Sequence, residues 1–202
     1  MSTDSVTLPA IPATLRWQVL PVSWNTGDDG ALTITAGPHT DLFVDPQGAD
    51  AALNAPRLLF SPPGEYMLSA RVTVGFTSTF DAGVLLLYAD QHSWAKLCFE
   101  YSPQGQPMIV SVVTRGFSDD ANAFVVDGNQ VFLRIARLGP AFAFHASTDG
   151  AYWQLIRHFT LDTSAPIAVG FVAQSPTGAG CTATFERISY TAGRLSDLRS
   201  GV

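Results

Sequence analysis

One short segment of the chain combines three side chains suited to binding or acid–base chemistry. Apolar and polar residues alternate from 94 to 101, which predicts a β-strand. Trp94, Lys96 and Glu100 then share one face of that strand, because side chains two residues apart point the same way. An indole stacks against sugar rings, while an ammonium and a carboxylate hydrogen-bond to sugar hydroxyls. The pattern predicts a saccharide-binding surface; the alternative is a cross-strand ion pair beside a half-buried tryptophan that only stabilises the sheet.

An arginine and two adjacent carboxylates follow the next predicted strand, residues 108–114. If the two strands form a hairpin, Arg115 and Asp119 lie near the Trp94 end of the first strand. Such groups in a loop are able to orient a polyol or to hold a calcium ion, although adjacent aspartates are also common in solvated turns. No cofactor is predicted, with calcium as the alternative. The predicted ligand-binding residues are Trp94, Lys96, Glu100, Arg115, Ser118, Asp119 and Asp120.

The motifs of well-known enzyme classes are absent. The chain contains neither the G-x-S-x-G pentapeptide of serine hydrolases nor the glycine spacing of phosphate and dinucleotide loops. Glycoside hydrolysis needs two carboxylates facing each other across a groove. The hairpin would allow Glu100 to pair with Asp119 or Asp120 in this way. No catalytic residue is predicted, and a protein that is not an enzyme is favoured.

Other aromatic and polar residues give weaker signals. Trp17, Trp24, Asp41 and Phe43 each have the chemistry to line a groove, but core packing is the usual role of a lone tryptophan. The four histidines show no close metal-ligand spacing, so no metal site is predicted; they are His39, His92, His145 and His158.

Composition restricts the class of protein. Hydrophobic residues make up 47% of the 202 residues and charged residues 14%, which favours a folded globular chain. A net charge of -6 with only 11 Lys and Arg argues against a nucleic-acid partner. No run of 18 apolar residues predicts a membrane-spanning helix, and the start of the chain lacks the pattern of a secretory signal, so a cytoplasmic location is expected. Cys98 and Cys181 are then expected to be reduced thiols.

The rest of the chain reads as short strands separated by turns. Residues 66–74 alternate most clearly, and the sequences at 139–140 and 149–150 predict hairpin turns. The segment at Trp17 is too polar for a central strand, and residues 192–199 are compatible with one final helical turn. The other predicted strands are 31–36, 57–60, 82–88, 94–101, 108–114, 122–126, 131–138, 141–147, 152–161, 167–173 and 182–190.

So many strands must stack as two sheets or close into a barrel to bury their apolar faces. No internal repeat or domain boundary is visible. We therefore predict one all-β domain over residues 1–202, with short extensions at both ends and the architecture of a two-sheet antiparallel sandwich.

Several stretches together resemble a domain-of-unknown-function family that includes the yeast regulation-of-enolase protein, and the resemblance extends from Trp17 to Tyr190. The turn at 147–153 is similar to one in concanavalin A-like and laminin G-like sandwiches, including the C-terminal domains of some xylosidases. The resemblance implies a jelly roll of the concanavalin A-like lectin/glucanase superfamily with one concave sheet. It transfers no reaction, and the Glu-x-Asp-x-x-Glu strand of laminarinase-like hydrolases is missing here. The stretches that carry the family resemblance are 40–45, 54–56, 81–90, 94–96 and 111–120.

Three functional hypotheses follow. The first is a carbohydrate-binding, lectin-like module that uses the concave sheet face. The second is a non-catalytic protein-interaction or regulatory module, with a protein partner or a second copy of the chain. The third is a glycoside hydrolase or lyase in which Glu100 is the acid or base. Neither nucleic acid nor membrane is an expected partner.

Overall fold

The computed structural model describes residues 4–48 and 50–201, and within these ranges the chain forms strands and no helix. None of these residues therefore belongs to a helix long and apolar enough to cross a membrane. The strands are β1 (Ser5–Val6), β2 (Leu15–Val19), β3 (Ser23–Thr26), β4 (Leu32–Ala36), β5 (Leu42–Val44), β6 (Ala51–Leu53), β7 (Arg57–Phe60), β8 (Tyr66–Gly75), β9 (Ala82–Asp90), β10 (Ser93–Tyr101), β11 (Pro107–Arg115), β12 (Phe117–Val125), β13 (Gln130–Leu138), β14 (Ala141–Ser147), β15 (Gln154–Phe159), β16 (Ala168–Gln174) and β17 (Cys181–Ala192).

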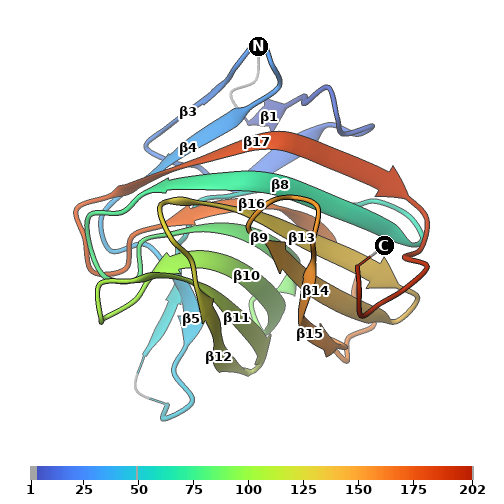
Figure 1. The fold of residues 1–202 in the computed structure, drawn as a ribbon. Helices are drawn as coiled ribbons and strands as arrows, with labels where there is room; N and C mark the ends of the chain where they lie inside the picture. Colours follow the sequence, from blue (N-terminus) through green and yellow to red (C-terminus); the bar gives the residue numbers. More distant parts are fainter. Residues whose placement is uncertain (1–3, 49, 202) are drawn as a thin grey trace.

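Two large antiparallel sheets stack face to face (Figure 1). The eight-stranded sheet has the order β1-β2-β7-β16-β9-β10-β11-β12, and the seven-stranded sheet has the order β15-β14-β13-β8-β17-β4-β3. The main core lies between them, where Leu85, Leu97 and Phe99 of one sheet belong to the same buried cluster as Val72 and Phe185 of the other. This arrangement confirms the predicted all-β, two-sheet antiparallel sandwich.

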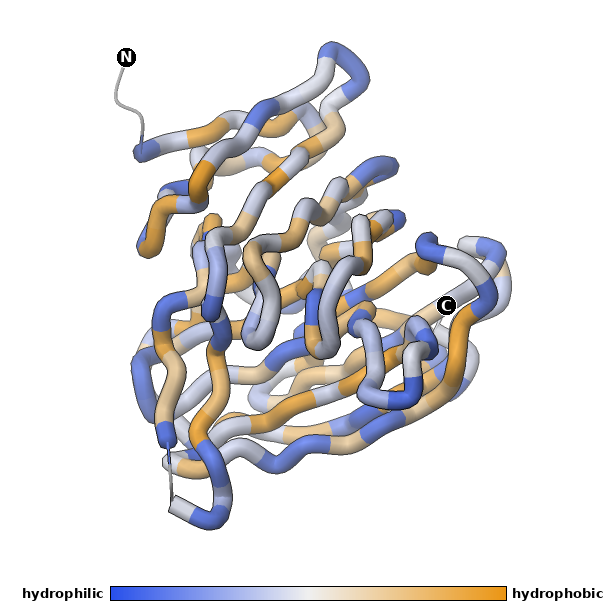
Figure 2. The backbone as a smooth tube through the Cα atoms, turned by 90° about the vertical axis from the view of Figure 1, so that its left-hand side faces the viewer, coloured by the Kyte–Doolittle hydropathy of each residue, from blue (hydrophilic) through white to orange (hydrophobic). Residues whose placement is uncertain are grey.

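The alternating sequence of the strands explains this packing. In β8 every second side chain from Tyr66 to Val74 is buried and the others are half-buried, as expected for a strand with one face in the core. Figure 2 shows the same alternation of hydrophobic and hydrophilic residues along the strands, with mostly hydrophilic turns.

Strands β9 and β10 are buried on both faces over most of their length. Their inner face lies in the main core, and their outer face belongs to a second apolar cluster that includes Leu42, Trp94 and Cys98. The β5–β6 hairpin covers this outer face. Its β5 contacts β12, and the hairpin lies at the lower left of Figure 1, beside β11 and β12. The hairpin therefore converts part of the outer face of the eight-stranded sheet into buried surface.

Each predicted strand is present. The turn at 139–140 connects the two strands of the β13–β14 hairpin, and the turn at 149–150 connects those of the β14–β15 hairpin. Cys98 and Cys181 are free and buried, as predicted. One prediction is wrong. Residues 117–120 form the start of β12 instead of a loop. Trp17 lies in β2, which is next to the edge strand β1 and is not a central strand, and a single turn near the end of the chain is closed by the hydrogen bond from Gly201 N–H to Asp197 O. The five short strands β1, β2, β3, β5 and β6 were not predicted, because runs of two to five residues carry too little alternation to recognise.

Candidate functional site

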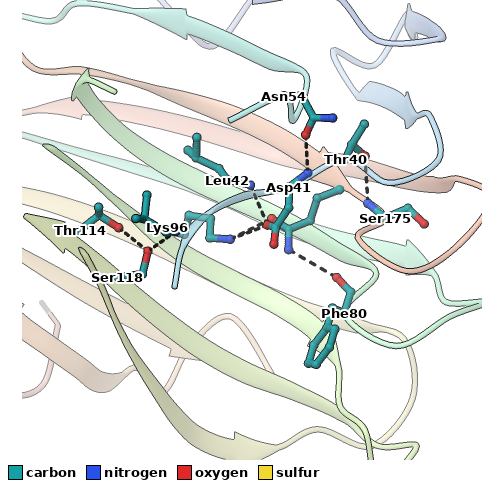
Figure 3. A network of polar contacts seen from close by, with 11 residues as sticks. Thr40, Asp41, Leu42, Asn54, Phe80, Lys96, Thr114, Ser118 and Ser175 are labelled. Atoms are coloured by element: carbon teal, nitrogen blue, oxygen red, sulfur yellow. Dashed lines mark hydrogen bonds and ion pairs between the residues drawn. The ribbon is translucent and has the colours of Figure 1, made fainter. Parts of the chain in front are cut away.

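A cavity of about 140 Å³ opens on the outer face of the eight-stranded sheet, beside the β5–β6 hairpin. Its walls come from the hairpin, from the loop before β9 and from strands β10, β11, β12 and β16. Polar side chains meet there in the network of Figure 3. The lining residues are Asp41, Phe43, Phe80, Lys96, Glu100, Val112, Asp120 and Gln174.

Strand register explains why these polar residues meet. Lys96 and Asp120 occupy one row of cross-strand neighbours, separated by a single residue of β11. Glu100 lies four residues further along β10, on the same face as Lys96. Gln174 of β16 occupies the row of Glu100, with the small Ala82 of β9 between them. Side chains from strands far apart in sequence therefore converge on one face.

Lys96 lies at the centre of the polar network. Its side chain is 2% exposed, and its Nζ donates hydrogen bonds to Asp41 Oδ1 at 3.0 Å and to Gln174 Oε1 at 3.1 Å. Burial by itself would lower the pKa of Lys96, but the nearby negative groups, Asp41 first, raise it above its ordinary value. Lys96 is therefore an ammonium whose charge is balanced by Asp41.

The hairpin that supplies Asp41 is held on the sheet by specific hydrogen bonds (Figure 3). The side chain of Asn54 accepts from the backbone N–H of Asp41 at 3.0 Å, which ties the two ends of the hairpin together. Further along, the N–H of Val44 donates to Ser118 Oγ at 2.9 Å, and Ser118 is bonded in turn to the hydroxyl of Thr114. The position of Asp41 is thus fixed from both sides.

Glu100 and Asp120 face the cavity without a cationic partner of their own. Among the described residues, neither carboxyl group takes part in an ion pair. Burial raises the pKa of Glu100 to about 8, although Lys96 opposes the shift and Asp120 adds to it. Burial also raises the pKa of Asp120, against the attraction of Lys96. At neutral pH the Glu100 carboxyl is therefore mostly protonated and able to donate a hydrogen bond.

This protonation makes stability depend on pH. The folded protein retains a proton on Glu100 between its ordinary pKa of 4.5 and about 8, while the unfolded chain releases it, so the free energy of unfolding falls as pH rises through that window. We expect Glu100→Gln to remove this dependence of stability on pH and to be more stable than the parent by about 5 kcal/mol at about pH 9, with no such gain at about pH 4. Urea unfolding at both pH values measures the effect.

The control for that experiment is Glu65→Gln, which alters a surface ion pair with Arg194 and should change stability by less than about 1 kcal/mol at either pH. An equal effect of Glu100→Gln at both pH values would contradict the protonated state of Glu100.

The structure brings three of the predicted ligand-binding residues together: Lys96, Glu100 and Asp120 all line the cavity. Trp94 differs from the prediction. Its side chain is 0% exposed and packs under the β5–β6 hairpin in the outer apolar cluster, with Lys96 Nζ 5.7 Å from its ring centre. The ring therefore supports the lysine and offers no face to a sugar.

The other predicted residues have structural partners elsewhere. Because β12 is a strand, Asp119 and Asp120 point to opposite faces. Asp119 pairs with Arg157 of β15 at 2.8 Å, at the edge of the sandwich. Arg115 donates to the carbonyl of Thr160 at 2.6 Å, and Ser118 anchors the hairpin. Within the described ranges, no group of three or more His, Cys, Asp or Glu residues is arranged to hold a metal ion.

Phe80 also lines the cavity, and no pattern in the sequence indicated this role. Its side chain is 37% exposed, and its backbone φ of 69° lies in the left-handed region, which costs a residue other than glycine about 1–3 kcal/mol. Its N–H donates to Tyr101 O at 2.7 Å and its carbonyl accepts from Gln174 Nε2 at 3.4 Å. Strain that the surroundings maintain next to a cavity is characteristic of functional sites.

Asp41 and Phe43, whose side chains were considered able to line a groove, both line this cavity. Gln174 was missed, because it ends an otherwise apolar strand and no local pattern distinguishes it from a strand terminus.

A family model described as "Protein of unknown function (DUF1349)" matches residues 17–193. Among solved structures, a functionally unknown protein from Saccharomyces cerevisiae superposes with a TM-score of 0.82 and 24% sequence identity, over 90% of this chain and 97% of that one. The comparison with curated proteins found no match.

Two further solved structures share the fold at lower identity. The GH43 BlXynB protein from Bacillus licheniformis matches with a TM-score of 0.72 and 17% identity, over 89% of this chain but only 37% of that one. The carbohydrate binding module CBM66 from Bacillus subtilis matches with a TM-score of 0.57 and 12% identity, over 87% of this chain and 95% of that one. These likenesses establish a shared β-sandwich.

Proposed function

Since the chain belongs to the DUF1349 family of proteins of unknown function, we propose its function from its own cavity: it binds a saccharide at the outer face of the eight-stranded sheet. The observation that carries this proposal is the pairing of a fixed polar network with two phenylalanines. Lys96 and Gln174 are held in place, and Phe43 and Phe80 line the same cavity. Saccharide sites combine such groups, because aromatic rings stack on the apolar faces of sugars while polar groups bond to hydroxyls.

The size of the cavity limits how much of a ligand enters it. A volume of about 140 Å³ is small beside the roughly 300–1,000 Å³ typical of pockets for drug-sized ligands. We therefore expect the cavity to receive one sugar unit of a saccharide, with the remainder of the ligand outside.

The comparisons support this proposal only through the fold. One structural neighbour is a carbohydrate binding module by its title and another is a GH43 protein, so the same sandwich is compatible with saccharide recognition. A fold hosts many functions, and the argument for this chain therefore comes from its cavity.

Acid–base catalysis is a second candidate, favoured by one observation. Glu100, protonated at neutral pH, and the carboxyl group of Asp120 line the same cavity, and glycoside cleavage uses a pair of carboxyl groups in which one donates a proton. Cleavage products formed from a bound saccharide would favour this candidate, whereas a saccharide recovered intact after prolonged incubation would favour binding alone.

Replacing Phe80 by glycine tests the binding proposal. We expect saccharide binding about tenfold weaker, a loss of about 1.4 kcal/mol, because a stacking ring is removed. Stability should not fall in parallel, since glycine adopts the left-handed φ of residue 80 without strain. Calorimetric titration of a panel of neutral and charged disaccharides, together with thermal unfolding, measures both effects.

The matched control is Phe117→Ser. Phe117 is also exposed, at 57%, but it does not line the cavity, so its replacement should leave binding unchanged. Absence of any saccharide bound by the parent protein more tightly than about millimolar, or roughly −4 kcal/mol, would refute the proposed function.

A further inference from the structure

The charges that face the cavity do not cancel. The hairpin contributes Asp41, β10 contributes Lys96 and Glu100, and β12 contributes Asp120. Lys96 and Asp41 neutralise each other through their 3.0 Å ion pair. Arg157, whose charge also acts on Asp120, forms its ion pair with Asp119 on the opposite face of β12. The side chains that line the cavity therefore include one carboxylate in excess of the Lys96–Asp41 pair when Glu100 is protonated, and two when it is not.

A ligand can supply the missing positive charge. An uncompensated carboxylate in a partly buried site is costly, and a cation that pairs with it removes this cost. The two phenylalanines strengthen the same preference, because the faces of aromatic rings attract cations. An anionic ligand would add to the negative charge and would be repelled.

From this charge imbalance we infer that the site selects saccharides that carry a protonated amine, that is, amino sugars without an N-acetyl group. This inference rests on the proposed function and specifies its ligand class. The ammonium group would lie against Asp120 and Glu100, and the sugar ring against Phe43 and Phe80.

A set of disaccharides with one linkage separates charge from shape. Cellobiose, N,N′-diacetylchitobiose and the fully deacetylated glucosamine disaccharide share the β-1,4 linkage and differ in the group at carbon 2. Titration of each into the full chain near neutral pH should show the deacetylated disaccharide binding at least about tenfold more tightly than the other two. Cellobiouronic acid, which bears a carboxylate, should bind most weakly.

Two variants of β12 assign the preference to a residue. Asp120→Asn removes the excess charge and should reduce the preference for the amine to less than about threefold. Asp119→Asn changes the adjacent residue, whose side chain faces away from the cavity to Arg157, and should retain the preference. Thermal unfolding of both variants establishes that they are folded when compared.

The outcomes distinguish the two proposals. If none of the four disaccharides binds, the proposed function and the preference for amines both fail. If cellobiose or diacetylchitobiose binds as tightly as the amine, or the uronic acid does, the preference alone fails. A preference for the amine that survives in Asp120→Asn would also overturn it, because the charge that we invoke would then lie elsewhere.

Discussion

Replacing Lys96 by methionine is expected to lower the free energy of unfolding by about 3 kcal/mol and to abolish ligand binding at the cavity. The side chain is 2% exposed, and its ammonium is the ion-pair partner of Asp41. Methionine fills a similar volume but leaves the Asp41 carboxylate without its cation and Gln174 without its donor. Urea unfolding and disaccharide titration measure the two losses.

A double-mutant cycle separates the ion pair from the packing of the lysine stem. Asp41→Asn removes the carboxylate, so the double variant with Lys96→Met leaves neither charge without its partner. We expect the double variant to be more stable than Lys96→Met alone, because breaking one side of a buried pair costs more than removing both. Strictly additive losses would show that Lys96 and Asp41 do not interact energetically.

Replacing Gly170 by alanine is expected to destabilise the protein by about 3 kcal/mol or more. Gly170 lies in β16 opposite Leu59 of β7. A methyl group there would overlap the carbonyl oxygen of Leu58 and approach Leu59 Cα to 3.0 Å. Both neighbours are backbone atoms, so the methyl group fits only if β7 and β16 separate within the eight-stranded sheet.

The control is Gly75→Ala at the end of β8. A Cβ at this position would meet its nearest neighbour, Thr182 O, at an ordinary 3.7 Å, and we expect a change within about 1 kcal/mol. Chemical unfolding of both variants compares them directly. Equal stability of the two would mean that β7 and β16 do not approach as closely as the structure places them.

The parts of the fold and site that could be predicted depend on local alternation. The alternation of apolar and polar residues at 66–74 and 94–101 identifies two strands. The short connection after residue 101 predicts that the next strand, 108–114, pairs with strand 94–101 as a hairpin. These two facts are sufficient to place Lys96 and Glu100 on one face. The position of Asp120 could be predicted only with the correct start of β12. A strand that begins at residue 122 leaves Asp119 and Asp120 in a loop and gives no reason to distinguish them. A strand that begins at residue 117 places the two side chains on opposite faces.

What could not be predicted comes from distant parts of the chain. Trp94 is buried because a hairpin of two three-residue strands folds over it, and strands so short leave no periodic signal. Gln174 reaches Lys96 because β16 inserts between β7 and β9 in the eight-stranded sheet. Such strand order is a property of the tertiary fold and leaves no trace in the sequence around either residue.

The burial of Lys96 also limits the reaction of its amine with the aldehyde form of reducing sugars. Lys96 is the only lysine in the sequence, and the folded chain keeps its Nζ bonded beneath the hairpin. Glycation begins when an unprotonated lysine amine attacks the open-chain carbonyl of a reducing sugar, and here that amine is both inaccessible and held as an ammonium. The fold thus protects the lysine side chain of this protein from covalent damage by reducing sugars.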